Sequence, residues 1–198
     1  MENKIQIVFA TGNVHKVKEI NEIAKGSGIE FILPPEGFDP DENGKTFQEN
    51  SFIKAKDAAV LSDSISLADD SGLCVEALNG EPGLYSARYA PTPQERIDKL
   101  LKNLANSANR KAKFVCAMTL VDKHGNILNQ EIGECYGQIA TRQAGLNGFG
   151  YDPVFVPNGY DITIAQMPES LKNTISHRSL ALNKMIEFIN VNLIDRKF

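Results

Sequence analysis

The fold is decided by the opening stretch IQIVFATGNVHK, residues 5–16. Its first six residues form a short, nearly all-apolar run, which is typical of a strand covered on both faces. Thr11-Gly12-Asn13 ends this run, and apolar residues then recur at helical spacing from Val17 to Ala24, until Gly26 stops the pattern. The stretch therefore predicts a strand, a tight turn and a helix.

Three further helices have recognisable start signals. Thr46 with Glu49 three residues later forms a capping box, and apolar residues follow at helical spacing towards Leu61. A second capping box, Thr92 with Glu95, has a proline at the first helical position. Ser176 is a suitable cap for a last helix with a clear apolar stripe.

Short apolar runs bounded by turn residues predict the remaining strands. The runs are 30–33, 65–68, 73–77, 113–122, 127–140 and 154–156. Of these, 65–68 is expected to end in the turn-like sequence Asp69-Asp70-Ser71-Gly72, and 113–122 to form an antiparallel hairpin with 127–140. No repeat or linker interrupts the chain of 198 residues, which at about 150 residues per domain predicts one large domain or one two-lobed unit over 1–198.

Composition and charge exclude several classes of protein. The chain has 21 Lys and Arg against 25 Asp and Glu, a net charge of −4, so it lacks the global positive field that holds a nucleic acid. Cys74, Cys116 and Cys135 are widely spaced without a C-x-x-C pair, which argues against a disulfide framework and a zinc site. No run approaches the roughly 18 apolar residues of a membrane span. We therefore expect a cytoplasmic protein with neither a nucleic acid nor a membrane as partner.

The first predicted helix begins with cations in an unfavourable place. Lys16 and Lys18 lie near its start, where the helix dipole disfavours each cation by roughly 0.3–1 kcal/mol. A phosphate bound by the backbone amides of Gly12, Asn13 and Val14, with Lys16 on the same oxygens, would reverse the sign of this interaction. The alternative is that both lysines point into water.

The last predicted helix repeats this arrangement. His177 and Arg178 follow Ser176 at once, and Lys172 lies just upstream. The planar fork of Arg178 suits a phosphate or a ring oxygen, and His177 can donate a hydrogen bond from either nitrogen. Alternatively, the His-Arg pair forms a solvated face.

Two adjacent carboxylates, Asp69 and Asp70, are the sharpest local signal. They repel each other unless a cation or a proton lies between them, and Mg²⁺ is bound in just this way by one or two carboxylates together with substrate phosphates. Glu42 in the acidic loop 36–45 is a plausible third ligand, with Asp41 and Glu49 as weaker candidates. The alternative is an Asp-rich turn without a metal.

The glycine-rich loop 145–153 is suited to a flat aromatic ligand. Its glycines let the backbone approach a ligand closely, and it presents Phe149 and Tyr151. A base could stack on Phe149 while Asp152 accepts a hydrogen bond from its edge. Alternatively, the aromatic residues form a buried plug beneath the loop.

Taken together, these motifs resemble the inosine triphosphate pyrophosphatase family, the non-canonical purine nucleoside triphosphatases also called XTP/dITP diphosphatases. The motifs are TGNVHK at 11–16, TFQEN at 46–50 with KAK at 54–56, LADDSGL at 67–73, PGLYSARY at 82–89, GFGYDP at 148–153 and SHR at 176–178. They extend over nearly the whole chain, from Phe9 to Arg178. Two positions depart from the family pattern: His15 stands where small residues are frequent, and the acidic loop leaves the choice of metal ligand between Asp41 and Glu42 open.

The resemblance implies a fold and a reaction. The fold would be an elongated mixed α/β sheet flanked by helices, with two lobes around a central cleft. The protein would be a homodimer that hydrolyses ITP, dITP and XTP to the monophosphate and diphosphate with Mg²⁺ as cofactor. The implied triphosphate-binding residues are Thr11, Gly12, Asn13, Val14, His15 and Lys16. Asp70 would be the proton acceptor and a metal ligand, and Ser71 would touch the substrate. The implied base and phosphate pocket consists of Phe149, Gly150, Tyr151, Asp152, Lys172, His177 and Arg178.

The chemistry of these residues agrees with that reaction. Phosphoryl transfer needs positioning and charge neutralisation, which the Lys16 loop, Mg²⁺ on Asp69 and Asp70, and Lys54 would supply. Water activated by the metal and Asp70 would attack the α-phosphorus. Donors to a 6-oxo group, with His177 and Arg178 as candidates, would select against a 6-amino base. Two alternatives stay open: a pyrophosphatase of modified pyrimidine triphosphates, and a nucleotide-binding protein without turnover.

Overall fold

The computed structural model describes residues 4–194, apart from the side chains of His15 and Ile194. Its helices are α1 (Val14–Ile23), α2 (Phe47–Ser62), α3 (Pro93–Asn103), α4 (Glu169–Ile175) and α5 (His177–Ile189), followed by a π-helical turn at Asn190–Ile194. Its strands are β1 (Ile5–Phe9), β2 (Ile29–Ile32), β3 (Ser66–Val75), β4 (Lys111–Val121), β5 (Ile127–Ile139) and β6 (Phe155–Pro157). Short 3-10 helices include Gly83–Arg88 and Asp152–Val154.

Within the described residues, the six strands form one mixed sheet in the order β2-β1-β3-β4-β5-β6. β1 pairs in parallel with both β2 and β3, whereas β5 and β6 pair antiparallel. β4 and β5 are the predicted hairpin, joined by a turn in which the amide of Gly125 donates to the Asp122 carbonyl. The mixed α/β class expected from the sequence is confirmed.

The chain divides into two compact units. Unit 1 contains the residues up to Asp70, residues 116–133 and the residues from Arg178 onward. Unit 2 contains residues 71–115 and 134–177. Each unit has its own hydrophobic core.

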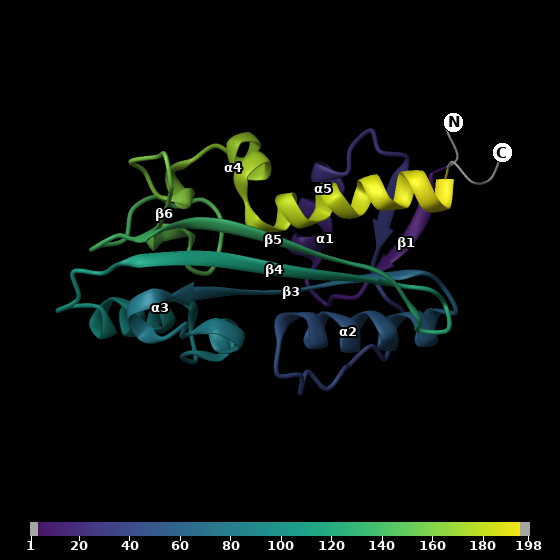
Figure 1. Cartoon of the computed structure of the whole chain (residues 1–198), viewed down its shortest axis with the longest axis horizontal. Coiled ribbons are helices and arrows are strands. Elements are labelled where there is room, and N and C mark those ends of the chain that lie inside the picture. Colours follow the sequence, from purple (N-terminus) through teal and green to yellow (C-terminus); the bar gives the residue numbers. More distant parts are fainter. Residues whose placement is uncertain (1–3, 195–198) are drawn as a thin grey trace. The chain divides into compact units, whose positions relative to one another are not determined.

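Helices cover both faces of the sheet in unit 1, as the apolar run at residues 5–10 predicts. On one face, Ile7 and Phe9 pack with residues of α1 and α5, such as Ile20 and Leu182. On the other face, Val8 and Ala10 pack against the alanines of α2. Figure 1 shows α2 on one side of β1 and α1 with α5 on the other.

The core of unit 2 is built from residues of α3 and of strands β3, β4, β5 and β6. α3 begins as predicted, because Thr92 and Glu95 make both hydrogen bonds of the capping box. No helix of residues 4–194 is both long and apolar enough to span a membrane.

Candidate functional site

Asp69 and Asp70 lie in the middle of a strand, where a turn was expected. β3 runs without a break over Ser66–Val75, so the prediction of two short strands separated by a turn is wrong. Successive side chains of a strand point to opposite faces of the sheet. Each carboxylate therefore has its own hydrogen-bond partners.

Asp69 is bound by two cations of unit 1. Its side chain is 1% exposed, and Lys16 Nζ lies 3.0 Å from Oδ1 and 3.2 Å from Oδ2. Arg178 donates to Oδ2 from Nε at 3.2 Å and from Nη2 at 3.0 Å. Burial raises the pKa of Asp69, but Lys16 and Arg178 more than offset it and hold that pKa well below its usual value. Asp69 is therefore a permanent anion that fixes Lys16, and its predicted role as a metal ligand is not supported.

Arg178 is directed to carboxylates and not to a base. Its side chain is 2% exposed, and besides the two bonds to Asp69, Nη1 donates to Glu19 Oε2 at 2.8 Å. Burial lowers the pKa of the guanidinium, but Asp69 and Glu19 raise it above its usual value. This geometry makes Arg178 a support for Asp69, and its expected role as a donor to the base stays a prediction.

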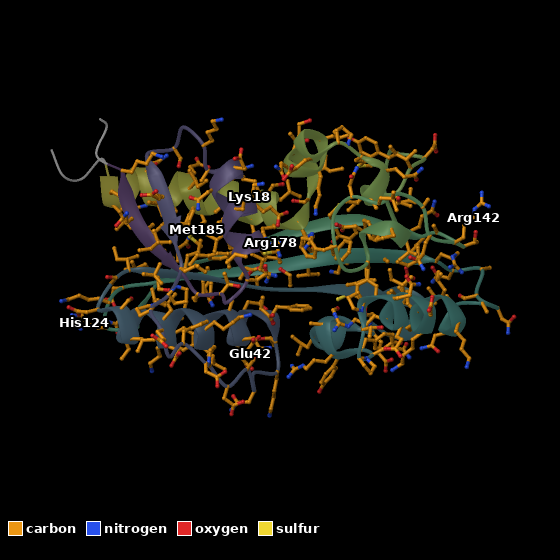
Figure 2. The ribbon with its side chains drawn as sticks, turned by 180° about the vertical axis from the view of Figure 1, so that it is seen from behind. Lys18, Glu42, His124, Arg142, Arg178 and Met185 are labelled. Carbon is orange, nitrogen blue, oxygen red and sulfur yellow. The ribbon has the colours of Figure 1, made fainter. Side chains whose placement is uncertain are left out.

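The predicted phosphate loop lies where β1 passes into α1. Thr11 is buried and its hydroxyl accepts from the Asn13 amide at 3.1 Å, while Gly12, Asn13 and Val14 are exposed. α1 carries no acidic residue in its first turn, so the positive end of its dipole is not neutralised there. The side chain of His15 lies outside the described part of the chain. Lys18 is exposed, which agrees with the alternative that this lysine points into water (Figure 2).

Asp70 lies in a second charge cluster, with Lys54 and Glu42. Lys54 Nζ is 3.3 Å from Asp70 Oδ1 and 3.0 Å from Glu42 Oε2, and it thus holds both carboxylates. Asn50 Nδ2 donates to Asp70 Oδ2 at 3.1 Å. Burial, together with the nearby charges of Asp69 and Glu42, raises the pKa of Asp70 by more than Lys54 and Asn50 lower it. The pKa of Lys54 is also raised, because the attraction of Asp70, Asp69 and Glu42 exceeds the opposing effect of burial.

Of the two carboxylates considered in the acidic loop, Glu42 belongs to this cluster and Asp41 has a different partner. Glu42 lies on the part of the loop that runs beside α2 (Figure 2), whereas the Asp41 carboxylate accepts from the side chain of Asn43. Thr46 caps α2 as predicted. The Glu49 carboxylate, however, accepts from the amide of Lys45 and not from that of Thr46, so the second bond of the predicted box is displaced by one residue.

In unit 2, a second predicted group of residues is brought together around Asp152. Its Oδ2 accepts from the Phe149 amide at 2.9 Å and from Lys172 Nζ at 2.9 Å. Lys172 Nζ also lies 4.5 Å from the centre of the Phe149 ring, which is 50% exposed. Gly148 has a φ of +77°, and a Cβ there would lie 2.1 Å from Asp152 Oδ2, so this turn requires glycine. An exposed aromatic face with fixed polar groups beside it is suited to a base.

Other residues predicted for this pocket have different surroundings. Tyr151 is 4% exposed and its hydroxyl donates to the Ser86 carbonyl at 3.0 Å, so it anchors the loop to the core and does not present its ring to a ligand. Gly150, next to it, has a φ of +61°, a conformation that favours glycine. His177 is buried and stacks on Phe114 with ring centres 4.8 Å apart. Ser71 is half-buried on β3.

Comparison with known proteins decides the family. The model of the Ham1 family matches residues 7–188. This chain belongs to the Ham1 family. The resemblance inferred from its motifs is thereby confirmed. The Ham1 protein of Staphylococcus aureus has a TM-score of 0.85 to this chain and 39% identity, covering 94% of this chain and 99% of its own. A HAM1 protein from Coxiella burnetii has a TM-score of 0.86 and 38% identity with the same coverage.

Relatives of this Ham1 chain are named for an activity. A protein of Parasynechococcus marenigrum called dITP/XTP pyrophosphatase is 43% identical over 175 residues, which cover 88% of this chain and 90% of the relative. Another of the same name, from Methylacidiphilum infernorum, is 41% identical and covers 96% of both chains.

The sequence alone does not assign a role to Glu19 and Asn50, two buried residues of the site. Glu19 stands three residues after Lys16 and thus on the same side of α1, a spacing that offered a local signal. Asn50 is part of the TFQEN motif, but its partner Asp70 lies 20 residues away in sequence. The predicted metal trio of Asp69, Asp70 and Glu42 is not brought together, and the described residues contain no group of three or more His, Cys, Asp or Glu side chains placed to hold a metal.

Proposed function

We propose that this protein hydrolyses dITP, XTP and ITP to the nucleoside monophosphate and diphosphate. The observation that carries the proposal is the match to relatives named dITP/XTP pyrophosphatase over about nine tenths of both chains. The charge clusters of unit 1 contain groups suited to a triphosphate, and the aromatic loop of unit 2 contains groups suited to a base. A free nucleotide needs only a local group of cations, so a chain with a net charge of −4 can bind it without the basic surface that a nucleic acid requires.

Unit 1 holds the groups suited to the triphosphate. The exposed start of α1 offers backbone amides and the positive end of the helix dipole to an anion. Lys16, in the first turn of α1, has its ammonium fixed by Asp69 at 3.0 Å. A preorganised cation neutralises phosphate charge without having to be ordered during the reaction.

Glu42 and Asp70 are the candidate ligands for a divalent metal. Both reach the same ammonium of Lys54, at 3.0 and 3.3 Å, so their oxygens converge on one small region. Mg²⁺ is typically bound by one or two carboxylates plus waters and phosphate oxygens, and this pair fits that preference. When bound, Mg²⁺ would supply Lewis-acid neutralisation of the phosphate oxygens.

Asp70 is the proposed proton acceptor. Burial raises its pKa, which makes its carboxylate a stronger base than an exposed aspartate. It would take a proton from the water that attacks the α-phosphorus, and the diphosphate would leave. Lys54, 3.3 Å from Asp70, would stabilise the negative charge that develops on the phosphorus oxygens.

Unit 2 holds the groups suited to the base. The exposed face of Phe149 offers stacking, and Lys172 and His177 are candidate donors to a 6-oxo group. A 6-amino group at the same place could not accept from these donors, which is a basis for discrimination. This arrangement would favour deaminated purines over adenine.

A nucleotide panel tests the proposal. Diphosphate release is measured for dITP, XTP, ITP, dATP, dGTP and a modified pyrimidine triphosphate, each with Mg²⁺ and with excess EDTA. We expect Mg²⁺-dependent release that is fastest with the deaminated purines. Preferential hydrolysis of the pyrimidine would favour the alternative pyrophosphatase class, and binding without release would show a nucleotide-binding protein.

We also propose that the protein is a cytoplasmic homodimer. The support for the dimer is the resemblance of its motifs to the inosine triphosphate pyrophosphatase family, and the support for the cytoplasm is the three free, widely spaced cysteines, which suit a reducing compartment. Light scattering coupled to size-exclusion chromatography measures the mass, and a value of 21.8 kDa for the single chain would contradict the dimer.

A further inference from the structure

Asn50 uses both ends of its side-chain amide in unit 1. The residue is 2% exposed and lies in the first turn of α2. Its Oδ1 accepts from the backbone amide of Gly44 at 2.8 Å, and its Nδ2 donates to Asp70 Oδ2 at 3.1 Å. One side chain therefore connects the acidic loop to the carboxylate proposed as the base.

The backbone of the acidic loop packs closely against Asn50 at Gly44. A Cβ at Gly44 would lie 2.6 Å from Asn50 Oδ1 and 2.9 Å from the Asn50 backbone nitrogen, so the backbone of the loop rests directly on α2. Gly44 follows Glu42 by two residues, and residues this near in sequence move together. Holding Gly44 therefore restricts where the Glu42 carboxylate can go.

Stability of α2 alone does not explain Asn50. The helix already has Thr46 as its cap, and the adjacent Ser51 anchors it through a 2.7 Å hydrogen bond to Thr119. Asparagine is a poor residue inside a helix, because its side chain competes for backbone hydrogen bonds. Its two bonds to groups outside the helix are a more specific reason for its presence.

We propose that Asn50 is a positioning residue that holds Glu42 and Asp70 in the relative placement needed to bind a divalent cation. The inference rests on the proposed function for the identity of the two ligands. Asn50 acts on Asp70 directly, and on Glu42 through the loop. It does not itself touch the cation.

Two variants separate the two ends of the amide. Asn50→Ala removes both hydrogen bonds. Asn50→Asp keeps an oxygen for the Gly44 amide but replaces the donor to Asp70 with a carboxylate oxygen. Ser51→Ala is the matched control, because this buried neighbouring helix residue directs its side-chain hydrogen bonds to Gln48 and Thr119.

The first measurement is hydrogen exchange of the loop in the full-length protein without metal. We expect the Gly44 amide to exchange about tenfold faster in Asn50→Ala, the factor that the net value of one hydrogen bond supplies. Asn50→Asp and Ser51→Ala should exchange there at the wild-type rate. Wild-type exchange in Asn50→Ala would overturn the inference.

The second measurement is the Mg²⁺ concentration for half-maximal diphosphate release from dITP. Residues that orient metal ligands typically contribute about 10- to 100-fold to metal affinity, so we expect an increase of that order in Asn50→Ala and none in Ser51→Ala. An unchanged Mg²⁺ requirement in Asn50→Ala would contradict the positioning role. A wild-type protein without dITP hydrolysis would instead contradict the proposed function, while the exchange result for the loop would stand.

Discussion

Replacement of Asp69 by asparagine should destabilise the protein strongly. The change leaves the buried guanidinium of Arg178, 2% exposed, with the Glu19 carboxylate and without its bonds to Asp69. Breaking a buried ion pair by removing one partner costs about 3–5 kcal/mol, and Lys16, which is partly exposed, can turn to water at little further cost. We therefore expect the free energy of unfolding of Asp69→Asn to fall by about 3–5 kcal/mol, a large part of the roughly 5–15 kcal/mol of a typical domain.

Urea denaturation at several pH values measures this effect. Lys16 and Arg178 hold the pKa of Asp69 well below its usual value in the folded protein, against about 3.9 in the unfolded chain. A carboxyl with a lowered folded pKa contributes stability that is present above the unfolded pKa and is lost as pH falls through the folded pKa. The gap between wild type and Asp69→Asn should thus be constant from about pH 5 to 7 and narrow below about pH 4.

The neighbouring carboxylate supplies the control. Burial raises the pKa of Asp70, so the ionised form of Asp70 lowers the stability of the folded protein at neutral pH. In Asp70→Asn, Lys54 still has the Glu42 carboxylate as its partner. The free energy of unfolding of Asp70→Asn should therefore lie within about 1 kcal/mol of the wild-type value. A loss of less than about 1 kcal/mol in Asp69→Asn, or a gap that persists unchanged at low pH, would refute the reasoning.

Three further substitutions test the assignment of the site residues. Asp70→Asn should lower kcat for dITP by at least about 100-fold, the low end of what a general base contributes, and near wild-type kcat would remove Asp70 from the mechanism. Phe149→Ala should raise KM for dITP by roughly 5- to 150-fold with little change in kcat, because base stacking on an aromatic ring contributes about 1–3 kcal/mol; an unchanged KM would argue against stacking there. Tyr151→Phe should lower the free energy of unfolding by about 0.5–1.5 kcal/mol through loss of its bond to Ser86 and leave KM unaltered, whereas a raised KM would return Tyr151 to the binding site.

The helices and strands that could be predicted from the sequence are those determined by residues close to one another in the chain. The strand, turn and helix of residues 5–23 follow from hydrophobic spacing, and the start of α3 follows from its capping box. β3 could not be predicted as one strand, because Asp, Ser and Gly favour turns when only neighbours in sequence are considered. In the folded protein, ion pairs from Lys16, Arg178 and Lys54 stabilise the two carboxylates within the strand.

The site shows the same division between local and distant causes. Residue types that suit phosphate and a metal pointed to Lys16, Lys54, Glu42 and Asp70, and the structure places all four in the charge clusters of unit 1. The opposite orientation of Asp69 and Asp70 depends on the continuity of β3, and with it Asp69 pairs with Lys16 and Arg178. The roles of buried polar residues such as Asn50 depend on partners that the fold alone brings near, 20 residues away in this case.

The central claim is that this protein cleaves the bond between the α- and β-phosphates of a deaminated purine triphosphate. The most direct measurement is hydrolysis of dITP with Mg²⁺ in ¹⁸O-labelled water, with the products identified by mass spectrometry. We predict dIMP that carries one labelled oxygen, together with unlabelled diphosphate. Formation of dIDP and orthophosphate, or label in the diphosphate, would contradict it.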